Sequence, residues 1–244
     1  MKPDNISGPF NNWGKTHEQA TTLPDTGYMA SYMTKVYGWM FLGLLITAFV
    51  SYLTASSTAA VSFILGNRLV FLGIIIGELV LVGSLVVRIR KMSALAATVI
   101  FLAYAALNGL VFSILFLAYT SGSLLGVFAI TAGTFGVMSA VGYFTKQDLT
   151  SFGKIMIMGL IGVVIASIVN WFMQSEALYW IISYVGVAVF VGLIAYDTQK
   201  IKSYALLDRE EDRKKGAVMG ALSLYLDFVN LFILLLRLFG GRRS

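Results

Sequence analysis

The chain has 244 residues, of which 58% are hydrophobic and only 12% are charged. A soluble domain carries about 25% charged residues, so this composition excludes a water-soluble fold and indicates a polytopic membrane protein. The chain contains no cysteine, which excludes disulfides, thiolate metal sites and thiol catalysis.

The N-terminal region differs in composition from the rest of the chain. Residues 1–30 are polar and contain Pro, Gly, Asn and Thr, which predicts a disordered cytoplasmic tail. They contain no apolar core of the kind that a signal peptide needs. Residues 31–241 are predicted to form a single transmembrane domain.

Long uncharged stretches define the membrane spans, because a helix that crosses the hydrocarbon layer needs about 20 mostly apolar residues. The 32 uncharged residues 36–67 predict one span followed by a short Ser/Thr/Gly loop. The 54 uncharged residues 92–145 predict two spans with a turn at 120–123. A charged linker, 208–215, precedes the last apolar stretch. The expected all-α domain has seven spans, at 34–55, 68–89, 93–118, 122–144, 153–174, 177–198 and 216–239.

The distribution of basic residues predicts the orientation of these spans. With a cytoplasmic N-terminus, 14 of the 18 Lys and Arg residues fall on the inner side, as the positive-inside rule requires. The net charge of +6 is thereby explained by topology, and a nucleic-acid partner is not supported. The remaining basic residues are Arg68, Arg237, Arg242 and Arg243. The last three favour, mildly, a re-entrant final segment that would leave the C-terminus inside.

A few ionisable residues interrupt the apolar spans. Each costs about 2.5–3.5 kcal/mol on insertion scales, so each is a candidate functional residue. They are Glu78, Arg88, Asp197, Asp227 and Arg237.

The spacing of these residues predicts two rows of matching charges. Glu78 and Arg88 lie ten residues apart, as do Asp227 and Arg237, and ten residues extend about 15 Å along a helix. The two spans run in opposite directions in the predicted topology. We therefore expect Glu78 to meet Arg237 at mid-membrane.

At the inner face, the same arrangement pairs a basic residue with an acid. The basic residue is Arg88 or Arg90, and the acid is Asp227 or Asp197. A simpler interpretation also stands for Asp197, which lies at a helix end and can face cytoplasmic water. Asp227 lies between apolar neighbours and must be neutral, paired or next to a water-filled cavity.

Two segments resemble the signature of the Bax inhibitor-1 family of membrane proteins, and most closely its bacterial branch. They are 195–202, Ala-Tyr-Asp-Thr-Gln-Lys-Ile-Lys, and 221–232, Ala-Leu-Ser-Leu-Tyr-Leu-Asp-Phe-Val-Asn-Leu-Phe. The glutamate of the second span, the basic cluster 88–91 and the ending Leu-Leu-Arg-Leu-Phe-Gly at 235–240 are similar to that family too. The resemblance covers about residues 30–241.

The resemblance implies a seven-helix bundle with the last helix packed centrally. It also implies a pH-sensitive calcium leak in the bacterial inner membrane, gated by a pair of aspartates that falls on Asp197 and Asp227. Two such carboxyl groups can share a proton near neutral pH. Their oxygens also suit transient binding of Ca²⁺, which is the permeating ion. The resemblance implies no cofactor. The other implied residues are the latch arginine, Arg88 or Arg90, and the mid-membrane pair, Glu78 and Arg237.

Two other classes of function compete with the leak. The first is a regulatory membrane protein that acts through a partner, such as a membrane-anchored quality-control protease. The second, more remote, is an intramembrane aspartyl protease. Leu-Tyr-Leu precedes Asp227 instead of the Gly-x-Gly of those enzymes, and the only histidine, His17, lies in the tail. The sequence therefore predicts that the protein is not an enzyme.

Overall fold

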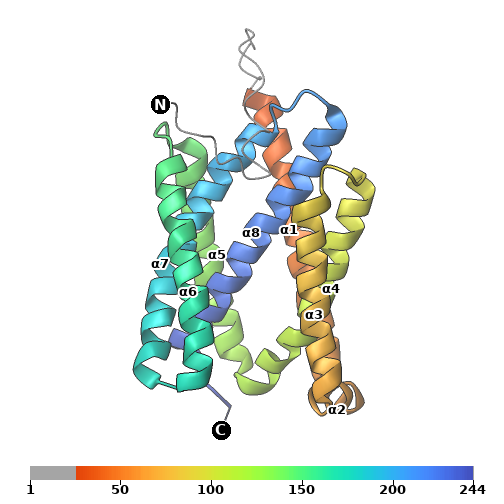
Figure 1. Cartoon of the computed structure of the whole chain (residues 1–244), viewed down its shortest axis with the longest axis vertical. Helices are drawn as coiled ribbons and strands as arrows, with labels where there is room; N and C mark the ends of the chain where they lie inside the picture. Colours follow the sequence, from red (N-terminus) through yellow and green to blue (C-terminus); the bar gives the residue numbers. More distant parts are fainter. Residues whose placement is uncertain (1–25, 244) are drawn as a thin grey trace, which may run out of the picture.

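The computed structural model describes residues 26–243, and these residues form eight α-helices (Figure 1). The helices are α1 Thr26–Ala55, α2 Thr58–Leu65, α3 Arg68–Arg88, α4 Ala94–Ala118, α5 Ser121–Phe144, α6 Thr150–Met173, α7 Glu176–Tyr204 and α8 Glu210–Phe239. Among the described residues, every helix except α2 is long and apolar enough to cross a membrane, which makes seven candidate spans. The predicted all-α fold with seven transmembrane helices is confirmed.

Three helices extend further than their apolar stretches predict. Helix α1 begins at Thr26, α7 ends at Tyr204 and α8 begins at Glu210, inside the expected charged linker. Polar contacts outside the apolar layer hold these ends: the Tyr32 hydroxyl of α1 donates to the carbonyl of Arg213 in α8, at 3.1 Å. The expected boundary of the tail at residue 30 is therefore a few residues too late. The tail itself, residues 1–25, lies outside the described residues.

The loop expected after the first span contains a short helix. Ser57 begins α2, because its hydroxyl accepts a hydrogen bond from the backbone N–H of Ala60, at 3.3 Å. Helix α2 has 8 residues and is about 12 Å long, so it connects α1 to α3 without crossing the membrane. A short apolar segment that follows a good N-cap forms a helix even where Ser and Thr are frequent.

Polar side chains also begin most of the spans. The side chain before the first helical residue accepts a backbone N–H in α3, α4, α5 and α7. These caps satisfy N–H groups that have no partner inside the helix. The capping residues are Asn67, Ser93, Thr120 and Ser175.

Helix α8 lies at the centre of the bundle, as the resemblance implies (Figure 1). It packs against α1, α4, α5 and α7. In an apolar stretch of 18 residues of α8, 72% of the stretch is buried inside the bundle, against 6% in the corresponding stretches of α3 and of α6. Helices α3 and α6 therefore lie at the periphery of the bundle and expose most of their apolar surface.

Glycine allows the helices to approach closely at two points around α7. A Cβ atom at Gly142 of α5 would overlap the backbone carbonyl of Ala195 in α7. A Cβ atom at Gly220 of α8 would meet the side chain of Ile201 at 2.9 Å. Small residues at helix crossings are typical of membrane proteins, where backbones pack closely.

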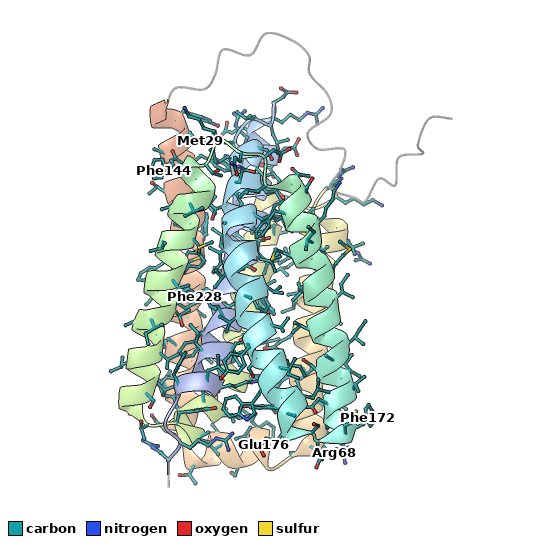
Figure 2. All side chains as sticks on the ribbon, turned by 90° about the vertical axis from the view of Figure 1, so that its left-hand side faces the viewer. Met29, Arg68, Phe144, Phe172, Glu176 and Phe228 are labelled. Atoms are coloured by element: carbon teal, nitrogen blue, oxygen red, sulfur yellow. The ribbon has the colours of Figure 1, made fainter. Side chains whose placement is uncertain are left out.

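The C-terminal end of α8 lies at the opposite face from its beginning. Its continuation is fixed to the turn between α4 and α5, where the N–H of Thr120 donates to the carbonyl of Gly241 and the N–H of Gly241 donates to Ser123. Helix α8 thus crosses the whole bundle as one unbroken helix, and the re-entrant alternative is wrong. Figure 2 shows Met29 and Phe144 at one end of the molecule and Phe172 near the other.

Candidate functional site

Asp197 of α7 and Asp227 of α8 line one cavity of about 600 Å³ between α6, α7 and α8. The charges of the two carboxylates act on each other. Asp227 is only 5% exposed, and its Oδ2 has no hydrogen-bond partner among the described residues. The structure therefore brings together the two aspartates that the family resemblance indicated.

Two polar residues next to the aspartates complete the inner part of the cavity. The Ser223 hydroxyl of α8 donates a hydrogen bond to the carboxylate of Asp197. The positive charge of Lys200 acts on both Asp197 and Asp227. Lys200 lies three residues after Asp197 and Ser223 four residues before Asp227, so each shares a helix face with its aspartate.

Neither neighbour is among the site residues expected from the sequence, although helical spacing points to both. Lys200 stands inside the segment 195–202 that resembles the family signature, of which only Asp197 was expected to take part in the gate. A test for residues at three- and four-residue spacing from each intramembrane acid would have selected Lys200 and Ser223.

The predicted arginine latch does not appear at the aspartates. Arg88 and Arg90 are exposed at the inner end of α3, and no ion pair joins Arg88 to either aspartate among the described residues. Helix α3 packs mainly against α4, whereas the two aspartates lie between α7 and α8. In this structure, the basic group whose charge acts on both acids is Lys200.

The predicted mid-membrane pair of Glu78 and Arg237 is not formed either. The charge of Glu78 acts on Tyr104 of α4, and its Oε1 is buried without a hydrogen-bond partner among the described residues. Arg237 is exposed, and its guanidinium lies 5.5 Å from the ring centroid of Tyr179 in α7. The second span was expected beside the last one, but α3 packs against α4 and α2, whereas α8 packs against α7, α1, α5 and α4.

Glu78 faces a region rich in buried polar side chains. The hydroxyl of Thr47 lies 2.7 Å from that of Tyr225, and the Asn108 amide donates to the Tyr104 hydroxyl at 3.0 Å. The charge of Glu78 acts on both tyrosines. The Thr47–Tyr225 pair joins α1 to α8, and the ring centroid of Tyr104 in α4 lies 5.8 Å from that of Tyr225.

The aspartate cavity continues along α8 as a partly polar groove. Four polar residues follow one another along one face of α8: Ser223, Asp227, Asn230 and Arg237. The distance along the helix from the first to the last is about 21 Å. The other walls are mostly apolar residues of α6 and α7. The groove thus joins two carboxylates in its inner part to a guanidinium near its outer end.

The groups present in the groove suit weak binding of a hard cation. Ca²⁺ takes six to eight oxygen ligands, and carboxylates are among those it prefers. Within residues 26–243, no three His, Cys, Asp or Glu side chains come together in a metal site. The two aspartates thus supply carboxylate oxygens from α7 and α8 to one cavity.

These features define a class of protein: a multi-pass membrane protein whose central, last helix carries an acid into the bundle. The chain belongs to the Bax inhibitor-1 family, since the family model described as inhibitor of apoptosis-promoting Bax1 matches residues 29–244. The family resemblance read from the two aspartate-containing segments is confirmed.

Several bacterial proteins are similar to this chain over almost their whole length. The inner membrane protein YbhL of Escherichia coli is 49% identical over 218 residues, which cover 88% of this chain and 93% of that protein. An uncharacterized protein of Borreliella burgdorferi is 44% identical over 215 residues, which cover 87% and 93%. An uncharacterized protein of Deinococcus radiodurans is 40% identical over 213 residues, which cover 87% and 91%.

The relatives and the apolar helices agree on the location of the protein. A relative of the inner membrane and seven membrane-spanning helices in the described residues make this chain a multi-pass inner membrane protein. The ends of α3 and α7 and the beginning of α8, next to the basic residues at 88–91 and 200–215, lie at the end of the bundle where α1 begins (Figure 1). By the positive-inside rule this end of the bundle faces the cytoplasm.

Proposed function

We propose that this protein is a pH-sensitive calcium leak of the inner membrane, gated by protonation of Asp197 and Asp227. Membership of the Bax inhibitor-1 family supports a channel or regulatory role in the membrane. The observation that carries the finer proposal is that both carboxylates line one cavity and act on each other there. The acids supply the two things that such a gate needs, a cation ligand and a proton acceptor.

The physical basis of the gate is the high energy of two adjacent carboxylates in a poorly hydrated place. Like charges in a low-dielectric region repel strongly, so the pair is stabilised by a proton, by a cation or by the ammonium group of Lys200. A proton and Ca²⁺ then compete for the same oxygens. The rate of calcium passage is therefore expected to change with pH.

Calcium flux into proteoliposomes tests this proposal. The purified protein should admit Ca²⁺ faster than empty vesicles do, at a rate that changes with pH near neutrality. Asp227→Asn removes a titrating carboxyl group at nearly constant volume, so the flux of this variant should lose most of its pH dependence. Asp148→Asn is the matched control, because Asp148 is exposed in the loop before α6 and should leave the pH dependence unchanged.

Two outcomes would contradict the gate. One is a wild-type flux that does not change with pH, and the other is a flux no greater than that of empty vesicles. In the second case the regulatory alternative, in which the protein acts through another membrane protein such as a protease, becomes the better account. Family membership is compatible with that role.

A further inference from the structure

A second cavity opens at the outer ends of α6, α7 and α8. We call it the outer pocket; its volume is about 600 Å³. Its polar lining includes Asn170, Ser175, Glu176, Arg237 and Arg242. Only Arg237 is shared with the groove of the aspartates, so the outer pocket is a separate site.

The outer pocket is positively charged. It contains two guanidinium groups, those of Arg237 and Arg242, and one carboxylate, that of Glu176. Neither arginine forms an ion pair within the described part of the chain. Arg237 instead lies over the ring of Tyr179, which leaves its planar guanidinium fork available to an anion.

Arg237 and Arg242 lie at the outer face of the membrane, where basic residues are unusual. The outer face of an inner membrane protein normally carries few basic residues, because basic loops are kept in the cytoplasm. Here three arginines gather around the end of α8. The guanidinium of Arg243 donates to the carbonyl of Phe116, at 3.2 Å, and therefore has a structural role. Arg237 and Arg242 line the pocket.

The rest of the polar lining also favours an anion. Helix α7 begins at the pocket, and its first N–H groups carry partial positive charge. The Oδ1 of Asn170 accepts the backbone N–H of Ser175, at 3.0 Å, so the Nδ2 of Asn170 remains as a donor in the lining. Guanidinium and amide donors of this kind recognise the oxygens of a phosphate group.

Apolar side chains beside the pocket indicate that the anion belongs to a lipid. Trp171, which lines the pocket, and its neighbour Phe172 are 78% and 81% exposed at the outer end of α6. Figure 2 shows Phe172 near the end of the molecule where Glu176 begins α7. Exposed aromatic rings at that level lie in the membrane interface, where headgroups and acyl chains meet. A free phosphate ion would gain nothing from such neighbours.

We propose that the outer pocket binds the phosphate-bearing headgroup of an anionic phospholipid from the outer leaflet. Arg237 and Arg242 contact the phosphate oxygens, and the acyl chains lie against the exposed rings of α6. The site does not depend on the proposed calcium leak, and its test does not use calcium.

Thermal unfolding of the full-length protein in detergent tests this site. Phosphatidylglycerol is the anionic probe, phosphatidylcholine the zwitterionic one, and glycerol phosphate the soluble phosphate without acyl chains. We expect phosphatidylglycerol to raise the unfolding temperature at lower concentration than phosphatidylcholine, and glycerol phosphate to have no effect. Arg242→Gln should weaken the response to phosphatidylglycerol about tenfold, as the loss of one charge-assisted contact predicts.

Arg68→Gln is the matched control, because Arg68 also lies at the outer face, on α3, and outside the pocket. Its response to phosphatidylglycerol should equal that of the wild type. Equal stabilisation by the two phospholipids, or an equal loss in both variants, would overturn the site. Stabilisation by glycerol phosphate as strong as that by phosphatidylglycerol would overturn its assignment to a lipid.

Discussion

At the scale of single residues, the ammonium group of Lys200 distinguishes this protein from a bare pair of acids. A positive charge beside two carboxylates favours their ionised forms and opposes the uptake of a proton. The family resemblance assigned this task to Arg88 or Arg90, but in this structure both are exposed, Arg88 at the end of α3 and Arg90 in the turn that follows. The charge acting on both acids comes from α7 itself.

Lys200→Gln therefore tests which basic residue sets the pH response. Removing the ammonium group makes proton uptake by the aspartates easier, so the midpoint of the flux against pH should move upward by about one pH unit. Arg88→Gln should leave that midpoint in place, and Lys154→Gln, an exposed lysine on α6, is the neutral control. Proteoliposome flux measured over a series of pH values gives all three midpoints. A shift with Arg88→Gln and none with Lys200→Gln would restore the arginine latch.

The two aspartates were predictable from the sequence, whereas the charged groups near them were not. An acid between apolar residues is visible in any chain, because its burial must be compensated. Its partner depends on which helices are neighbours, and matched spacing on two helices cannot supply that information. Glu78 and Arg237 illustrate the failure: the spacing of their charges agrees, but they lie on helices that other helices separate.

At the scale of secondary structure, close packing fixes α7 against its neighbours. The apolar stretches alone predicted the helices well, since the only strong demand of the bilayer is a long apolar segment. The polar extensions of α1 and α8 were missed because tertiary hydrogen bonds, rather than hydropathy, hold them, as the Tyr32 hydroxyl does at Arg213. The contact of Gly142 with Ala195 depends on tertiary packing in the same way.

Gly142→Ala should separate α5 from α7. The added methyl group overlaps the backbone carbonyl of Ala195, which cannot move as a flexible side chain would. Overpacking of this kind costs about 1–3 kcal/mol, and each kcal/mol lowers the unfolding temperature by about 2–4 °C in a chain of this size. Thermal unfolding in detergent measures the change.

Gly136→Ala is the control for helix propensity on α5. No atom of another described helix lies within 4 Å of the position that its Cβ would take, so the substitution adds a better helix former without a clash. Its unfolding temperature should equal or exceed that of the wild type. If both alanine variants unfold at the same temperature, the close approach of α5 to α7 does not exist in the membrane protein.

At the scale of the whole molecule, the central helix connects the two faces of the membrane. Helix α8 begins at the basic cytoplasmic face, carries Asp227 through the middle of the bundle and ends beside the outer pocket. The polar residues of α8 thus line one groove for about 21 Å along the helix. The basic residues before α8 predicted the direction in which it crosses the membrane. Its central position was implied only by the family resemblance, because an apolar helix has the same sequence pattern in lipid and inside a bundle.

The most direct test of the central claim asks whether Asp197 and Asp227 act as one unit. Calcium flux against pH is measured in proteoliposomes for Asp197→Asn, for Asp227→Asn and for the double variant. If one shared proton controls the gate, either single substitution removes most of the change of calcium flux with pH. The double variant then loses no more of this pH dependence than either single variant does. Two independent losses that add up in the double variant would show that the aspartates titrate separately, and the paired gate would be wrong.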